Sequence, residues 1–153
     1  FAALVEEAEL TPKPGLVDRH NNGAHDDMDL PLFRRSAAAL HPHLRHIAAL
    51  GMANAAPSAL QEAGLEAERA MFAATGGVNT HKGALYSFSL LLAAAGRCLC
   101  AGGDLFETVR RLAEQLQPPG RPTAFRCFSS TGSAAHGRRR WPGFPRRSVR
   151  LLC

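Results

Sequence analysis

The chain has 153 residues, which is enough for one domain with a core of its own and too few for two ordinary domains. Its apolar fraction of 46% is normal for a globular protein, and alanine and leucine supply most of it, which favours helices over strands. The net charge of +5 arises late in the chain, because residues 1–117 hold ten of the 18 basic residues and all 13 acidic ones. The charge therefore gives no reason to expect nucleic-acid binding by the body of the protein.

Five segments have the apolar periodicity of amphipathic helices, and no useful length shows the period of two that is typical of strands. Residues 1–10 resemble the end of a helix, so we expect that the true N-terminus is missing. The other predicted helices run from Asp29 to before Gly51, from Pro57 to Ala74, from Thr80 to before Gly102 and from Asp104 to Leu116. Asp29, Thr80 and Asp104 are the predicted N-caps. The predicted fold class is all-α: a helical bundle with two polar functional loops, in an incomplete domain.

Membrane and export signals are weak in this sequence. The longest apolar run, Leu90 to Gly96, is too short to span a bilayer, and the first ten residues carry three glutamates, unlike a signal peptide. The four cysteines fit neither a disulfide framework nor a zinc spacing. We expect a cytoplasmic protein that has reduced thiols and no membrane partner.

The first polar loop, Thr11 to Phe33, is too rich in charge to be there for packing. It holds Lys13, one of only two lysines in the chain, together with Arg19 and four of the five aspartates. Neighbouring carboxylates can hold a hard divalent cation such as Mg²⁺, and the basic side chains can bind phosphate oxygens.

The second polar loop, Thr75 to Gly83, holds the other lysine, Lys82, and resembles a phosphate cradle. Gly76 and Gly77 give backbone freedom, and the next helix offers unpaired N–H groups at its N-terminus. Lys82 would lie in the first turn of that helix, where a cation is unfavourable unless an anion offsets it. The spacing is not that of a Walker A motif.

Two interpretations of these loops stay open from residue types alone. Carboxylates, cations and a helix N-terminus together are the composition of a site for a nucleoside triphosphate. The same residues also make caps and turns in loops of purely structural importance. Glu68, close to the buried face of the third predicted helix, also has two interpretations. It belongs to a functional site, or it is a solvated carboxylate, as such residues usually are.

The two stretches TPKPGLVDRHNNGAHDDMD and EAERAMFAATGGVNTHKGA are similar to the signature motifs of the triphosphoribosyl-dephospho-CoA synthase family, the ATP:dephospho-CoA triphosphoribosyl transferases. The resemblance covers about residues 1–117, the N-terminal part of a longer family pattern. It implies an all-α enzyme that joins ATP to 3′-dephospho-CoA and releases adenine. The matching residues are Lys13, Pro14, Gly15, Asp18, Arg19, Gly23, His25, Asp27, Asp29, Glu68, Thr75, Gly76, Gly77, Asn79, Thr80, His81, Lys82 and Gly83.

The resemblance also suggests roles for these residues. Asp18 or Glu68 would be the base, and His25 or His81 would serve the departing adenine. Asp27 and Asp29 would hold Mg²⁺. The substrate phosphates would meet the basic side chains and the second loop, namely Lys13, Arg19, Gly76, Gly77, Asn79, Thr80 and Lys82.

The product would be the precursor of a prosthetic group that another transferase places on the acyl carrier protein of citrate lyase or malonate decarboxylase. Residues 118–153 depart from the family pattern, since they hold eight arginines and no acid. We expect a disordered basic tail or a stretch read out of frame, and exposed helix faces that favour a homo-oligomer. The alternative function is a non-catalytic nucleotide-binding helical module or an inactive fragment.

Overall fold

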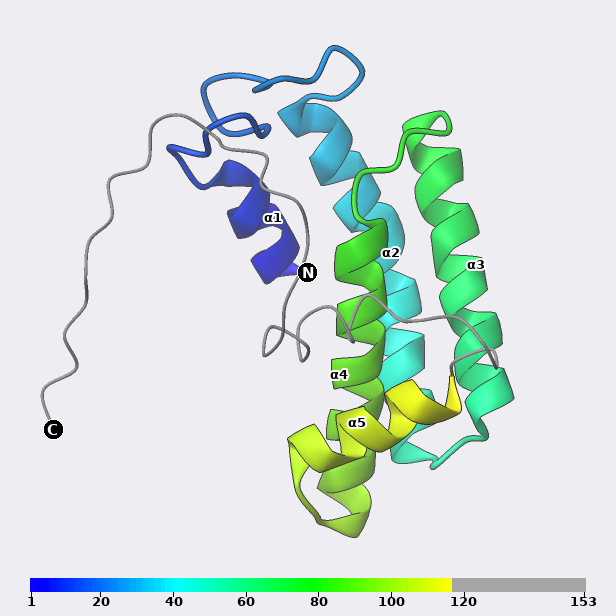
Figure 1. The fold of residues 1–153 in the computed structure, drawn as a ribbon. Helices are drawn as coiled ribbons and strands as arrows, with labels where there is room; N and C mark the ends of the chain where they lie inside the picture. Colours follow the sequence, from blue (N-terminus) through cyan, green and yellow to red (C-terminus); the bar gives the residue numbers. More distant parts are fainter. Residues whose placement is uncertain (117–153) are drawn as a thin grey trace, which may run out of the picture. The chain divides into compact units, whose positions relative to one another are not determined.

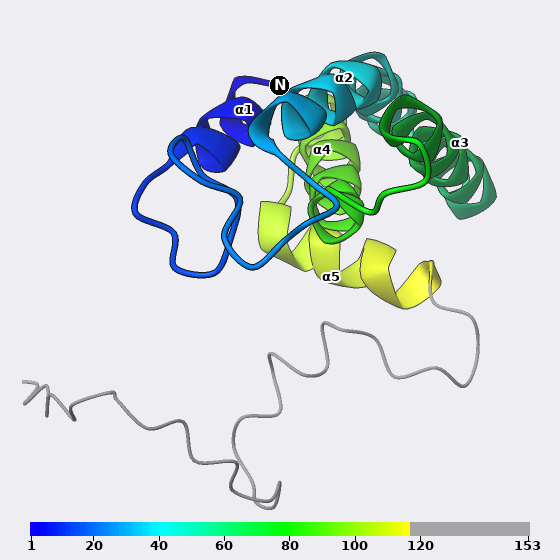
Figure 2. The ribbon, with the colours of Figure 1, turned by 90° about the horizontal axis from the view of Figure 1, so that it is seen from above.

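The structure is a computed structural model that describes residues 1–116, and the predictions for the basic tail lie outside these residues. The helices are α1 (Ala2–Glu9), α2 (Leu30–Met52), α3 (Pro57–Thr75), α4 (Lys82–Ala101) and α5 (Leu105–Gln115). No strand occurs among residues 1–116, which confirms the all-α prediction. The long helix α2 packs against both α3 and α4, and α5 crosses the far half of α4 (Figures 1 and 2).

Local capping signals fix where two of the helices begin. Asp29 Oδ1 accepts a hydrogen bond from the amide of Leu32 at 2.8 Å, and Asp104 Oδ1 accepts one from Glu107 at the same distance, so both predicted caps are confirmed. The predicted cap at Thr80 is wrong. The helix begins two residues later, and Asn79 Oδ1 accepts from the Lys82 amide at 3.2 Å.

The core consists of two clusters along the bundle. Around the first half of α2, the buried residues are Leu4, Ala37, Leu40, Leu44, Ala67, Met71 and Leu85. Towards α5, they are Ile47, Leu60, Ala63, Leu90, Ala93, Ala94, Val109, Leu112 and Ala113.

The buried faces of α3 and α4 are not single continuous stripes. On α4, Leu90 is buried, whereas its neighbour Leu91 is 38% exposed. The reason is that α4 contacts α2 on one side and α5 on another, so its buried surface is wider than a single stripe. On α3, Gly64 and Ala74 are only half-buried.

Two glycines let the backbones of α2 and α4 approach closely. A Cβ on Gly51 would lie 2.3 Å from the carbonyl oxygen of Ala93, and one on Gly96 would lie 2.6 Å from that of Ala48. Neither position has room for a side chain, so backbone contact sets the spacing of these two helices. That spacing matters for the site, because the second loop enters α4 directly.

Helix α4 as a whole is longer and more apolar than the short run that the sequence singled out. Its 20 residues contain a stretch that is long and apolar enough, by length and composition alone, to cross a membrane. A helix from the core of a soluble bundle passes the same test, and α4 packs against α2, α3 and α5 here.

Candidate functional site

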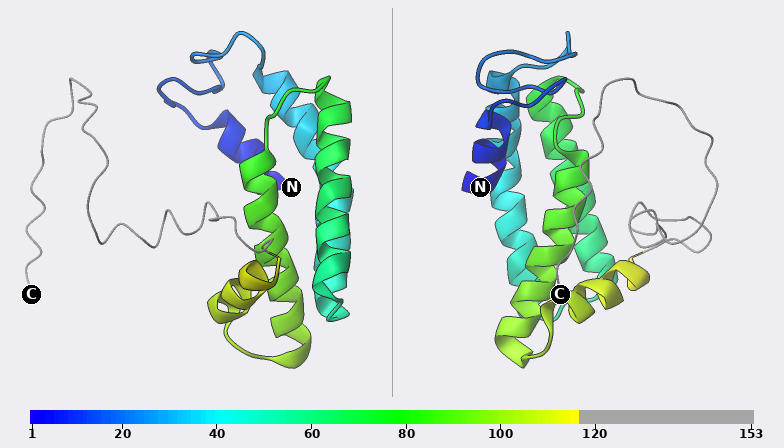
Figure 3. Two further views of the ribbon diagram at one scale, coloured as in Figure 1. Left: turned by 45° about the vertical axis from the view of Figure 1, so that its right-hand side comes forward. Right: turned by 60° about the vertical axis from the view of Figure 1, so that its left-hand side comes forward.

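The two polar loops lie at the same end of the bundle (Figures 1 and 3). We call residues 10–29 the first loop and residues 76–81 the second loop. His81, at the end of the second loop, joins them to the helices: its ring packs edge-on against Phe33 of α2, with centroids 5.0 Å apart. The charges of Glu7 and Lys13 also reach this imidazole. The fold therefore brings together two loops that have 46 residues between them in the sequence, residues 30–75.

Asp18 organises the first loop. Its side chain is 4% exposed and accepts hydrogen bonds from the backbone amides of His20 and Asn21 at 2.8 and 2.9 Å. The Thr11 hydroxyl, the Lys13 amide and the Asn21 side chain donate to it as well. These bonds, led by those from His20 and Asn21, lower the pKa of Asp18 to about 2. A carboxylate that is bonded so fully is a weak proton acceptor, which argues against Asp18 as the base.

The cations of the first loop are paired with carboxylates of α1. Lys13 Nζ lies 3.1 Å from Glu7 Oε1 and donates to the Glu7 carbonyl at 2.8 Å. Arg19 donates to Glu9 at 3.2 Å, and Arg34 of α2 donates to the same carboxylate. The hydrogen bond from Arg34 is the main cause of the lowered pKa of Glu9. Lys13, Arg19 and Arg34 thus each form an ion pair with a carboxylate of α1.

The second loop begins with a tight end to α3. Gly76 has φ +65° and Gly77 has φ +90°, both in the left-handed region that side chains rarely adopt, and the Gly77 amide donates to Phe72 at 2.8 Å. The Thr75 hydroxyl bonds to the carbonyl oxygens of Met71 and Val78 at 2.9 and 2.6 Å. A Cβ on either glycine would meet nothing within 4 Å, so the backbone here faces open space.

Lys82 and Glu68 form an ion pair at the end of α3 and the start of α4, with 2.5 Å between Nζ and Oε1. The pair explains why a cation is tolerated in the first turn of α4. The Glu68 carboxylate offsets the Lys82 charge, and its side chain is only 25% exposed. Glu68 is therefore not the solvated carboxylate that residue type alone favours.

His81 is the most buried of the predicted site residues on the second loop, at 4% exposure. Its Nδ1 lies 2.8 Å from the hydroxyl of Ser36, and the Thr80 hydroxyl donates to the same Ser36 oxygen at 2.7 Å. Its Nε2 is buried and has no hydrogen-bond partner among the described residues. Burial is the main cause of a lowered pKa for this imidazole, while Glu7 raises it and Lys13 lowers it.

The residues expected to hold Mg²⁺ are exposed and do not form a cage. Asp27 is 64% exposed and lies 3.8 Å from His25 Nδ1, while one oxygen of Asp29 is occupied by the α2 cap. No group of three or more metal-ligating side chains occurs in the described part of the chain. This donor set fits Mg²⁺ held by one or two carboxylates plus substrate phosphates and water, the usual arrangement for that ion.

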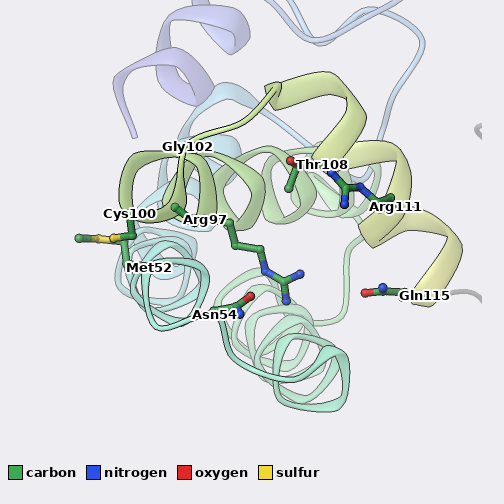
Figure 4. Close-up of a pocket in the computed structure, with 9 residues that line it drawn as sticks. Met52, Asn54, Arg97, Cys100, Gly102, Thr108, Arg111 and Gln115 are labelled. Carbon is green, nitrogen blue, oxygen red and sulfur yellow. The ribbon is translucent and has the colours of Figure 1, made fainter.

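Several hollows lie along the described part of the bundle, and one of them shares residues with the predicted site. A groove of about 230 Å³ between α3 and α4 is lined by Glu68, Lys82, Tyr86 and leucine side chains. A pocket of about 260 Å³ lies at the opposite end, where Arg97 points towards Asn54 and Arg111 (Figure 4). No residue of either motif lines that second pocket, so the candidate site comprises the loops and the adjoining groove.

Sequence reasoning missed Ser36, Arg34 and the two α1 glutamates that pair with the loop cations. For Ser36 a signal was present, because it lies four residues from both Leu32 and Leu40 on the buried face of α2. A buried hydroxyl on an apolar face needs a partner. Nothing in the sequence showed that the partner is 45 residues away.

Comparisons with known proteins agree with these motifs. The profile of the ATP:dephospho-CoA triphosphoribosyl transferase family matches residues 1–137, which extends past the boundary expected at residue 117. A probable 2-(5″-triphosphoribosyl)-3′-dephosphocoenzyme-A synthase of Albidiferax ferrireducens is 54% identical over 101 residues, 62% of this chain and 33% of that protein. The synthase of Haemophilus ducreyi is 48% identical over 103 residues, 63% of this chain and 32% of its own length.

A probable synthase of Streptococcus mutans is 46% identical over 119 residues, which are 74% of this chain and 40% of that protein. The chain thus spans about a third to two fifths of the length of these relatives. No solved structure gives a significant match. The family profile covers far more than half of the chain, and it includes both loops and all five helices. The chain belongs to the ATP:dephospho-CoA triphosphoribosyl transferase family.

Proposed function

We propose that this chain contributes the loop end of a site that joins ATP to 3′-dephospho-CoA with release of adenine. The product would be 2′-(5″-triphosphoribosyl)-3′-dephospho-CoA. The observation that carries the proposal is the convergence of both family motifs at one end of the bundle, where His81 of the second motif packs against Phe33 and Ser36 of α2. The relatives' printed names describe the synthase of this same compound.

The chemistry is a displacement at the ribose C1′ of ATP. The 2′-oxygen of the acceptor ribose forms the new bond to C1′, and the bond between C1′ and the adenine nitrogen breaks. Adenine leaves with the bonding electrons and takes up a proton, while the acceptor hydroxyl gives its proton to a base. The site must also bind the triphosphate without cleaving it.

Glu68 is the favoured base, because Asp18 is committed to five hydrogen bonds and has a pKa of about 2. We infer a partner exchange at the ion pair between Lys82 and Glu68. When a triphosphate oxygen binds Lys82, the Glu68 carboxylate loses its cation and faces the groove between α3 and α4. The acceptor hydroxyl would then lie next to a carboxylate that can take its proton.

Phosphate binding would use the same exchange at the first loop. Lys13 and Arg19 are now paired with Glu7 and Glu9 in exposed ion pairs, which are weak and easily replaced by a more highly charged anion. The open backbone at Gly76 and Gly77 and the loop residues just before α4, including Asn79 and Thr80, would add backbone N–H donors. Asp27 and Asp29 would ligate Mg²⁺, which supplies charge neutralisation for the triphosphate. His25, beside Asp27, or His81 would bond to the adenine.

Release of adenine tests the proposal directly. The purified chain is mixed with ATP, Mg²⁺ and dephospho-CoA, and the bases are separated by chromatography. We expect adenine only when both substrates are present, and a loss of roughly 10²-fold or more in Glu68→Gln. Glu66→Gln is the matched control, since Glu66 is exposed on the same helix.

Two other results would count against this function. Absence of adenine from soluble, helical protein would contradict it for this chain. Binding of ATP without release of adenine would instead support the alternative, a non-catalytic nucleotide-binding module.

The setting that we propose is cytoplasmic, and the downstream partners are an acyl carrier protein and the transferase that modifies it. The prosthetic group would serve citrate lyase or malonate decarboxylase, and the proposal includes both. A homo-oligomer would cover apolar side chains that are exposed here, such as Leu99 at 80% and Phe106 at 74%. Sedimentation of the purified chain measures its oligomeric state directly.

A further inference from the structure

We propose that Ser36 is a positioning residue for His81: its hydroxyl holds the imidazole as the tautomer that carries a proton on Nε2, ready to donate a hydrogen bond to a substrate. The inference rests on the proposed function for the identity of that substrate. Neither family motif contains Ser36, which lies on α2. Thr80, Ser36 and His81 form a hydrogen-bonded cluster with few protons to share.

The chain of hydroxyls sets the direction of the bonds. Thr80 donates to Ser36 Oγ at 2.7 Å, so the single proton of Ser36 is free to point at His81 Nδ1, which lies 2.8 Å away. Nδ1 is then an acceptor and carries no proton. Because a neutral imidazole has one N–H, its proton is on Nε2.

The surroundings of the ring favour the same arrangement. Ser36 is fully buried, and His81 is 4% exposed between Phe33 of α2 and Met71 of α3, whose sulfur accepts the His81 backbone amide at 3.4 Å. Such surroundings disfavour the doubly protonated, charged ring. The charges that reach the ring are Glu7, which raises its pKa, and Lys13, which lowers it, and both effects are smaller than that of burial.

Nε2 is the one nitrogen of this ring without a hydrogen-bond partner among the described residues. A buried N–H without a partner is unfavourable, and such groups are kept mainly where they have a use. A ring nitrogen of adenine or a phosphate oxygen would accept this bond. His81 would therefore stabilise the substrate as a neutral hydrogen-bond donor, and the proton that adenine takes up would come from elsewhere.

Nitrogen NMR of the histidines in the whole 153-residue chain tests the placement without any need for turnover. We expect His81 to be neutral at pH 7 with its proton on Nε2. In Ser36→Ala and in Thr80→Val the ring should become a mixture of the two tautomers, whereas Thr80→Ser should keep the original one. Ser87→Ala is the control, because Ser87 is an exposed serine on α4.

Several outcomes would overturn the inference: a proton on Nδ1 in the unmodified chain, a charged ring at pH 7, or a tautomer unchanged in both Ser36→Ala and Thr80→Val. If circular dichroism shows that Ser36→Ala does not fold, the tautomer in Thr80→Val still tests the inference. Thr80 is only half-buried, so this variant should fold.

Addition of ATP, Mg²⁺ and dephospho-CoA then tests the substrate contact. We expect the His81 Nε2 resonance to shift in the unmodified chain and about a tenfold loss of adenine release in Thr80→Val, with recovery in Thr80→Ser. A fixed tautomer with no binding of either substrate would defeat the proposed function but leave the role of Ser36 in place. Binding seen at other residues with no change at Nε2 would defeat the donor role alone.

Discussion

The two loops of the candidate site are held in place in different ways. The first loop is organised from within, because residues 11–21 of the same segment donate all the hydrogen bonds that Asp18 accepts within residues 1–116. The second loop is held by the bundle, through Ser36 of α2 and Met71 of α3. The first loop should therefore keep its shape when helices shift, whereas the second should respond to any change in their packing.

Asp18→Ala should have the largest effect of these substitutions, and it should act on the first loop and leave the helices unchanged. Removal of the carboxylate leaves the amides of His20 and Asn21 without their acceptor, so the first loop should lose its fixed conformation. Hydrogen exchange should show loss of protection at both amides. Helices α2, α3 and α4 should exchange as before. Loss of protection across the whole bundle would show that the first loop is not self-contained.

Gly76→Ala should affect the second loop through its backbone. With φ at +65°, an alanine there costs about 1–2 kcal/mol of folding free energy, measurable by urea unfolding. Gly64→Ala is the matched control, since it lies inside α3 with open space around it and should stabilise the protein by about 0.5–1 kcal/mol. Equal effects from the two substitutions would contradict the assigned role of the left-handed conformation.

Acid should loosen the loops at different pH values. His81 has a pKa below its ordinary 6.5, so it stabilises the fold while neutral, and this contribution declines as the pH falls below 6.5. Asp18 has a pKa of about 2 against an ordinary 3.8, so its contribution is present above pH 3.8 and is lost as the pH falls towards 2. Amide shifts followed from pH 7 to 2 should change first near His81. Simultaneous change in both loops would contradict this order.

The smallest effect on stability should come from Lys82→Gln. The Lys82 side chain is 56% exposed, and ion pairs of this kind contribute between zero and about 1 kcal/mol. Removal of a cation from the first turn of α4 also relieves an unfavourable interaction with the helix dipole. Thermal unfolding should therefore change little, while adenine release should fall. Arg45→Gln, an exposed site on α2, is the control.

Much of the helical framework could be predicted because its signals are local. Asp29 before Pro31 and Asp104 before Glu107 mark helix starts within four residues of chain, and both hold in the structure. The cap at Thr80 failed since the Thr80 hydroxyl bonds to Ser36 on another helix; the N-cap residue is His81, and the first amide of the helix, that of Lys82, donates to Asn79. A capping rule uses only neighbouring residues and does not include a contact with another helix.

The site was predictable as a set of residues and much less so as a set of partners. The motifs placed Lys82, Glu68 and His81 in one region, and the fold confirms that they converge. The ion pair between Lys82 and Glu68, and the contact of His81 with Ser36, depend on where helices cross. Asp18 shows the limit most clearly, because residue type suggested a base and its burial among five donors argues for a structural role.

The contact between Gly51 and Gly96 also has a consequence for how the protein should respond to hydrostatic pressure. Pressure acts on the empty volume in a protein, and two backbones in direct contact leave almost none between them. The groove beside Glu68 does hold open volume and should be compressed first. Ser36 lies on α2 and His81 directly precedes α4, the two helices that this contact joins, so the spacing between Ser36 and His81 should be among the last features of the site to change.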